Sequence, residues 1–123
     1  MPESRWVERQ IGRPVIKAFN NIYAKHLMEN GRPRGDSRRI ALPVSGDDRK
    51  AKAVVMKLMD DLGFDAVDAG SLDESWRHQP GTPVYTADHN SEGVRRALSE
   101  ASSKRPAQFQ AMEKSPGTYA KPA

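Results

Sequence analysis

The chain has 123 residues, of which 37% are hydrophobic and 29% are charged, and it contains no cysteine. This length accommodates one domain with one core and excludes the two-domain organisation of most dinucleotide-dependent enzymes. The lack of cysteine excludes disulfides and thiolate chemistry. No apolar run is long enough to cross a membrane, and the first residues lack the apolar stretch of a secretion signal, so we expect a cytoplasmic protein.

The formal net charge of +4 raises the question of nucleic-acid binding, because clustered Lys and Arg release counterions from a phosphate backbone. The basic residues gather in one Gly- and Pro-containing loop and are Arg32, Arg34, Arg38 and Arg39. The region that follows is acidic, with aspartates throughout residues 47–68. A solvated basic loop explains this pattern better than a DNA-binding site, so nucleic acid is not an expected partner.

The first third of the sequence predicts a helix, a strand and a second helix. Residues 3–10 have apolar side chains at helical spacing, and Gly12 is placed to end that helix. Residues 14–19 form a β-favouring run whose proline is tolerated at the first position of a strand. A short helix then follows, with Asn20 or Asn21 as its N-cap and an Asn-Gly pair at its end.

The central region predicts a strand, a crossover helix and a second strand. Residues 39–44 alternate, which places Ile40, Leu42 and Val44 on one face of the first strand. Residues 47–62 have the clearest helical periodicity of the chain and are followed by a second apolar run over residues 64–70. Such a unit is typical of a parallel sheet covered by helices, where small ligands bind beyond the ends of the strands.

The last part of the chain predicts less regular structure. Residues 71–83 leave regular structure through a proline- and glycine-rich segment, which predicts a stiff turn over residues 79–83. A helix is expected next, capped by Ser91 or Asn90 and with an apolar stripe of Val94, Ala97, Leu98 and Ala101. Residues 104–123 have few apolar anchors and stay unassigned.

These elements together predict an α/β fold, in which a short, mostly parallel sheet with flanking helices forms a partial Rossmann-like three-layer sandwich. Residues 1–88 are expected to form this domain, and residues 89–123 a C-terminal helix and flexible tail. The methionines expected to fill gaps in its core are Met28, Met56 and Met59.

Residues with catalytic or metal-binding chemistry are few. None of His26, His78 and His89 has a second histidine or a cysteine three or four positions away, so we expect structural histidines, no metal site and no catalytic acid or base. Adjacent carboxylates on a helix point in different directions, and a capping role near the positive helix end is sufficient for Asp47 and Asp48. The sequence also lacks a Gly-x-Gly-x-x-Gly fingerprint, a phosphate loop and a serine elbow.

Several segments, in order, resemble one known family. They are residues 15–22 (VIKAFNNI), 44–48 (VSGDD), 62–64 (LGF) and 68–72 (DAGSL). In that order they are similar to the C-terminal half of the NADPH-dependent F-420 reductases, which are Rossmann-type oxidoreductases. The turn over residues 79–85 resembles bacterial relatives of that group, and the similarity covers roughly residues 12 to 85 through several segments taken together.

The resemblance implies hydride transfer between the nicotinamide of NADP and a deazaflavin or flavin-type acceptor, with the protein positioning the two rings. It implies that Asn20, Asn21 and Ile22 lie near the acceptor ring and the nicotinamide. The family's N-terminal half, with its glycine fingerprint, has no counterpart in this sequence. We therefore expect a truncated domain that is inactive without that half, and whose sheet edge is covered by a second copy or by a complementing polypeptide.

An alternative function belongs to another class. The α/β unit would then be a scaffold without catalytic activity, and the basic loop and the C-terminal tail would bind a partner. Salt-dependent binding to nucleic acid separates one version of this alternative from the enzyme hypothesis, because counterion release requires affinity to fall as salt rises.

Overall fold

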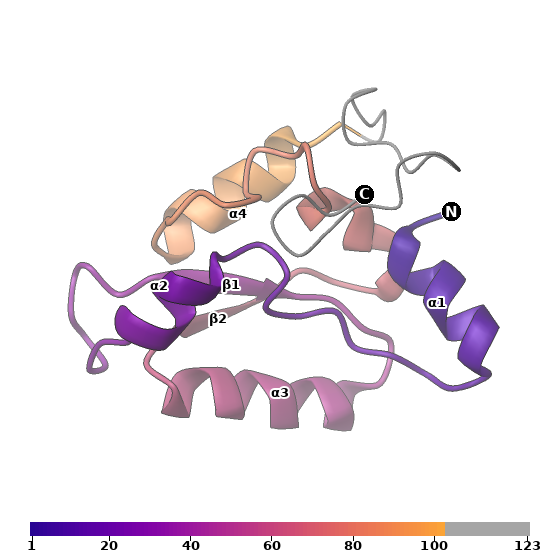
Figure 1. The fold of residues 1–123 in the computed structure, drawn as a ribbon, viewed down its shortest axis with the longest axis horizontal. Coiled ribbons are helices and arrows are strands. Elements are labelled where there is room, and N and C mark those ends of the chain that lie inside the picture. Colours follow the sequence, from indigo (N-terminus) through magenta and orange to yellow (C-terminus); the bar gives the residue numbers. More distant parts are fainter. Residues whose placement is uncertain (103–123) are drawn as a thin grey trace.

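A computed structural model describes residues 1–102 as a short parallel sheet between helices (Figure 1). In chain order the elements are α1 (Glu3–Ile11), α2 (Ala24–Glu29), β1 (Ala41–Val44), α3 (Arg49–Asp61), β2 (Asp65–Asp68), a 3-10 helix η1 (Leu72–His78) and α4 (Ser91–Glu100). The expected α/β class, with a parallel sheet and flanking helices, is confirmed. The predicted tail over residues 104–123 lies outside the described residues.

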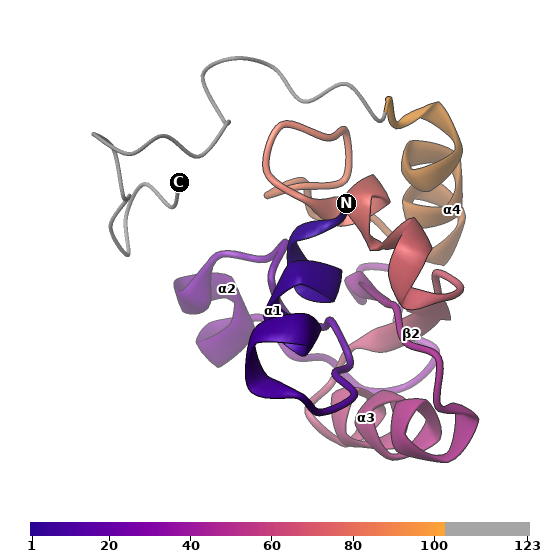
Figure 2. The ribbon, with the colours of Figure 1, turned by 90° about the vertical axis from the view of Figure 1, so that its right-hand side faces the viewer.

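The sheet has two parallel strands, and its register pairs Ala41 with Asp65 and Val44 with Asp68. Alternate side chains of the strands enter two separate cores. Leu42 and Val44 pack in a cluster with Ile22, Ile40, Met59 and Phe64. Ala41 and Val67 pack in a second cluster with Val84, Val94, Ala97 and Leu98. Helix α3 therefore covers one face of the sheet and α4 the other, as Figures 1 and 2 show.

Helix α3 begins slightly later than the sequence pattern suggests, at Arg49 rather than at Asp47. Asp48 is its N-cap, and its carboxylate accepts hydrogen bonds from the backbone N–H groups of Lys50 and Ala51. The capping role expected for this aspartate is confirmed, and it moves the first helical residue to Arg49 because the cap itself has extended backbone. After the helix, Gly63 has φ of 103°, and a Cβ there would lie 2.6 Å from the backbone nitrogen of Arg32.

The strand predicted over residues 14–19 is wrong. Only Lys17 pairs, through an isolated antiparallel bridge with Ser45 just beyond the end of β1. The segment meets the chain just beyond the last residue of β1 rather than along the strand, and Phe19 turns it away with φ of 61°. A β-favouring run forms a strand only where a neighbouring strand offers a ladder, and here the ladder is one residue long.

Helix α2 begins at Ala24, after Tyr23, and has no side-chain cap. The N-cap predicted for Asn20 or Asn21 is therefore wrong, because both side chains form hydrogen bonds with residues far along the chain. The core position predicted for Met28 is also wrong, since this residue is 85% exposed. Met59 is fully buried and Met56 packs at the margin of the core, as predicted.

The segment expected to lack regular structure contains η1, which buries Leu72, Ser75 and His78. These residues are three apart, which matches the three residues per turn of a 3-10 helix. Hydrophobic periodicity could not reveal this element, because two of its three buried residues are polar. The predicted turn follows it, where the Thr82 hydroxyl donates a 2.7 Å hydrogen bond to the carbonyl of Gln79.

Helices α1 and α4 lie where the sequence predicts them. Helix α1 ends at Gly12 with φ of 67°, and α4 starts after Asn90, whose side chain accepts a hydrogen bond from Gly93 N–H. Helix α1 buries none of its residues; Arg5 anchors it through ion pairs of 2.9 Å to Asp47 and to Asp73. No helix of residues 1–102 is long and apolar enough to cross a membrane.

Candidate functional site

An open pocket of about 360 Å³ lies beside the segment that follows α1. We call it the Asn20 pocket. Its lining comes from α1, from residues 16–20 around the bridge to Ser45, and from the segment after η1. The lining residues are Glu3, Ser4, Val7, Ile16, Lys17, Ala18, Asn20, Pro80 and Tyr85. Of the three residues that the family resemblance assigns to ligand binding, Asn20 lines this pocket.

A hydrogen-bond network fixes the Asn20 side chain. Asn20 Oδ1 lies 2.9 Å from His78 Nδ1, and Asn20 Nδ2 donates to the backbone carbonyl of His78 at 2.5 Å. On the other side of the ring, His78 Nε2 lies 2.7 Å from the hydroxyl of Ser45. The network therefore ties the pocket residue to η1 and to the residue just after β1.

The partners of the ring determine its tautomer. Asn20 Nδ2 is the donor to the main chain, so Oδ1 accepts from His78 Nδ1–H, and His78 Nε2 accepts from the Ser45 hydroxyl. Burial, with a smaller contribution from the positive charge of Lys17, lowers the pKa of His78 to about 3. The ring is neutral at pH 7, which suits a group that orients Asn20 and does not suit a proton donor.

A serine, a histidine and an orienting amide in hydrogen-bond contact also resemble the arrangement of a nucleophilic hydrolase. Ser45 is 0% exposed, however, and so is His78. A carbonyl substrate cannot approach a hydroxyl that is enclosed on all sides. The network is therefore structural support for Asn20 and not a nucleophilic centre.

Two left-handed residues flank the Asn20 pocket. Phe19 has φ of 61° and Thr86 has φ of 60°, and neither is a glycine. Each is next to a lining residue, Asn20 or Tyr85, and the Thr86 N–H donates a 2.6 Å hydrogen bond to the carbonyl of Asn21. Such backbone conformations are uncommon, especially for a β-branched residue such as threonine, and they concentrate at functional sites.

The structure places the other two predicted ligand residues beneath the pocket. Asn21 is 1% exposed, and its Nδ2 makes a long 3.5 Å contact with the carbonyl of Val84. Its Oδ1 is buried and has no hydrogen-bond donor among the described residues. Ile22 packs in the core cluster on the α3 side of the sheet. The sequence did not identify His78 as the partner of Asn20, or Ser45 as the partner of His78, because these contacts join residues 58 and 33 positions apart.

A second, larger pocket of about 650 Å³ lies where ligands of open α/β sheets usually bind, beyond the carboxyl ends of β1 and β2. Several of its polar groups are paired within the chain. The buried ammonium of Lys52 contacts Asp68 Oδ1 at 2.9 Å and the carbonyl of Gly70 at 3.2 Å. Gly46 N–H donates to that same carbonyl, and Asp47 accepts from Leu72 N–H. These contacts occupy the Gly46 and Leu72 N–H groups, which could otherwise donate to an anion.

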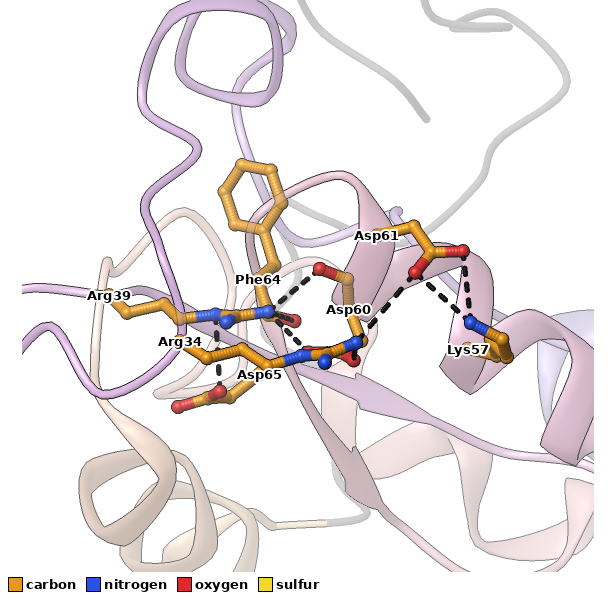
Figure 3. A network of polar contacts seen from close by, with 7 residues as sticks. All are labelled: Arg34, Arg39, Lys57, Asp60, Asp61, Phe64 and Asp65. Carbon is orange, nitrogen blue, oxygen red and sulfur yellow. Dashed lines mark hydrogen bonds and ion pairs between the residues drawn. The ribbon is translucent and has the colours of Figure 1, made fainter.

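The basic loop is held by ion pairs within the chain. Figure 3 shows Arg34 and Arg39 both reaching Asp60 at the end of α3. Arg34 lowers the pKa of that carboxyl group. Asp36 forms ion pairs with Arg32 at 3.6 Å and with Arg38 at 3.5 Å.

Arg39 departs most from the predicted solvated loop, because its side chain is 1% exposed. Its Nη2 lies 2.6 Å from Asp60 Oδ1, 2.8 Å from the Asp60 carbonyl and 2.9 Å from the Phe64 carbonyl. Its Nε forms a 3.2 Å ion pair with Asp65. A solvated role for this arginine is therefore wrong, because it fastens the loop to the start of β2.

The other two histidines lie apart from the Asn20 network. His26 Nδ1 lies 2.6 Å from Asp88 Oδ2, and His89 lies beside Gly93 at the start of α4. Within residues 1–102 no group of three or more His, Cys, Asp or Glu side chains is close enough to hold a metal ion.

Comparisons with known proteins extend these observations. No protein-family model matches the chain. The sequence is 40% identical over 86 residues to the putative protein YjhV of Escherichia coli (strain K12), a match that covers 70% of this chain and 56% of YjhV. The chain thus spans about half the length of the curated relative that it matches.

Two solved structures are similar to the chain. The hypothetical protein SMa0349 from Sinorhizobium meliloti matches with a TM-score of 0.63 at 29% identity, over 73% of this chain and 44% of that one. A putative F420-dependent NADP-reductase from Arthrobacter sp. FB24 is 30% identical over 58% of this chain and 33% of that one, with a TM-score of 0.49. The α/β unit matches part of a Rossmann-like fold. Over part of its length the sequence is similar to a putative F420-dependent NADP-reductase, from the family that its segments resemble.

Proposed function

We propose that the chain is one half of an NADP-dependent oxidoreductase fold that transfers hydride between NADPH and a deazaflavin or flavin-type acceptor. In this proposal NADP binds only when a complementing half from another polypeptide supplies the phosphate-binding glycines. The sequence has no Gly-x-Gly-x-x-Gly fingerprint of its own. The observation that carries the proposal is the Asn20 pocket, because the residue that the family resemblance assigns to the ligand is the one held there by a buried network.

The chemistry of the pocket suits the positioning of rings. Hydride passes directly between two ring systems, so the protein has to orient them and needs no acid or base. Asn20 has one amide hydrogen and one oxygen lone pair beyond those used by His78, and both can contact a ring substituent. The neutral His78 keeps this amide in one orientation, which reduces the entropy lost on binding.

The pocket also borders an unpaired backbone edge. Lys17 exchanges both of its backbone hydrogen bonds with Ser45, at 2.8 and 3.0 Å. Successive residues of an extended chain point to opposite sides, so Ile16 and Ala18 turn their N–H and C=O groups away from β1. Among the described residues none pairs with these groups. A strand of a complementing half would add at this edge and form the missing wall of the pocket.

Calorimetric titration with NADPH tests the proposal, in the presence and absence of a flavin or deazaflavin. The chain is titrated alone and together with the part of the Sinorhizobium meliloti protein that has no counterpart in it. We expect saturable NADPH binding only for the assembled halves, with the solution mass recorded in parallel. The proposal fails if the two halves form a complex of defined mass that does not bind NADPH.

A matched pair of variants then tests the role of Asn20. Asn20→Ala removes the amide at the pocket, and Asn30→Ala removes the same group at the end of α2, away from the pocket. We expect Asn20→Ala to weaken NADPH or acceptor binding by about tenfold, which corresponds to about 1.4 kcal/mol. Asn30→Ala should leave both affinities unchanged. Equal affinities for the two variants would show that the Asn20 pocket is not the binding site.

A further inference from the structure

The outer face of α3 carries a stripe of exposed apolar side chains. Val54 is 70% exposed, and Leu58 and Leu62 are each 50% exposed. They are four residues apart and thus form one row along the helix surface. The helix packs on the sheet through its opposite side, which includes Met59, and Figure 1 shows α3 as the outermost layer on this side of the molecule.

Two charged residues of opposite sign flank this stripe. Lys57 and Asp61 lie one turn apart, with Lys57 Nζ 3.2 Å from Asp61 Oδ1. Their side chains are 72% and 52% exposed, so both can form contacts with another molecule. In an antiparallel pair of these helices related by a two-fold axis, Lys57 of each copy faces Asp61 of the other. A surface with this arrangement is complementary to itself, as an interface between identical copies requires.

We propose that α3 of one copy packs against α3 of a second copy, antiparallel and about a two-fold axis close to Leu58. The apolar row, Val54, Leu58 and Leu62, forms the centre of the contact, and two Lys57–Asp61 pairs form its rim. Reciprocal charge favours a second copy over an unrelated partner, because a single sequence supplies both members of each pair. This inference is independent of the proposed oxidoreductase function.

The size of the contact determines its strength. A helix of 13 residues is about 20 Å long, and one such helix buries less than the roughly 800 Å² per partner of a standard stable interface. We therefore expect a weak dimer that forms and dissociates with concentration. Analytical ultracentrifugation from micromolar to millimolar protein should show the mass rise from that of one chain toward that of two.

Substitutions identify the surface. Leu58→Lys places a charge at the centre of the contact and should lower the association constant by about tenfold or more, which is about 1.4 kcal/mol. Met28→Lys is the matched control, because Met28 is an equally apolar, 85% exposed helical residue outside the stripe. Urea unfolding of both variants shows whether they remain folded. Association that is weakened equally by both substitutions would overturn the proposal, as would a monomer at every concentration.

A charge exchange tests the geometry. Lys57→Asp places two carboxylates opposite each other at each end of the contact, so association should weaken. This loss of association should be smaller at high salt, because salt screens the repulsion. The double variant Lys57→Asp with Asp61→Lys restores opposite charges across the axis and should recover most of the association. If the double variant associates no better than Lys57→Asp alone, the antiparallel two-fold arrangement is wrong.

Discussion

Replacement of Arg39 by methionine should destabilise the fold more than replacement of its neighbour Arg34, although both arginines contact Asp60. Arg39 is buried and holds the carbonyls of Asp60 and Phe64 as well as two carboxylates. Methionine fills the space of the aliphatic stem but leaves these carbonyls without their charged donor. Arg34 is 68% exposed, and water replaces its contact when it is removed.

The expected magnitudes follow from this difference in burial. Loss of one partner from a fully buried pair costs about 3–5 kcal/mol. Asp60 and Asp65 are 32% and 45% exposed, so water compensates part of their charge, and we expect about 2–3 kcal/mol for Arg39→Met. For Arg34→Met the expected loss is below about 1 kcal/mol, as for other surface ion pairs. Since a domain of this size has about 5–15 kcal/mol of stability in total, the first change is large.

Urea unfolding followed by circular dichroism measures both losses. With a slope of about 1–3 kcal/mol/M, Arg39→Met should lower the midpoint by about 0.7–3 M and Arg34→Met by less than about 1 M. Salt should reduce the effect of Arg34 and not that of Arg39, because buried charges are screened less. Equal shifts for the two variants would refute the argument that burial, and not the shared Asp60 contact, sets the energy.

Three further outcomes follow from the same contacts. His78 has its pKa lowered to about 3 in the folded state, against about 6.5 in the unfolded state, so stability is highest above pH 6.5 and falls as the pH drops toward 3. The loss should approach about 1.4 kcal/mol per pH unit in urea titrations, and it should vanish in His78→Asn. Asp48→Ala removes the cap of α3 and should cost about 0.5–2 kcal/mol, seen as a lower urea midpoint, whereas exposed Asp73→Ala should cost less. In fluorescence anisotropy at low salt we expect no binding to nucleic acid, because the arginines of the loop are paired with aspartates; tight, salt-sensitive binding would contradict this.

The sequence alone was sufficient to predict the central βαβ unit. Helix α3 and both strands follow from local patterns, since the helical repeat of Val55 and Met59 and the alternation of Leu42 and Val44 depend only on neighbouring residues. The ends of α1 and α4 also follow from local signals, a glycine in the left-handed region and an asparagine cap. Such features are encoded within a few residues and therefore appear in the sequence.

The tertiary structure decided which polar residues are buried. Arg39 was predicted to be solvated, and no local pattern marks His78 as fully buried, yet each is enclosed because partners far along the chain supply its hydrogen bonds. Residues 14–18 have strand propensity, but the fold offers them only one paired position, at Ser45. Asn20 required both sources of information. The family resemblance selected this residue, and only the tertiary structure showed that it contacts His78 at the edge of a pocket. Local physics determines the elements, whereas a polar site requires contacts between distant residues that no short pattern encodes.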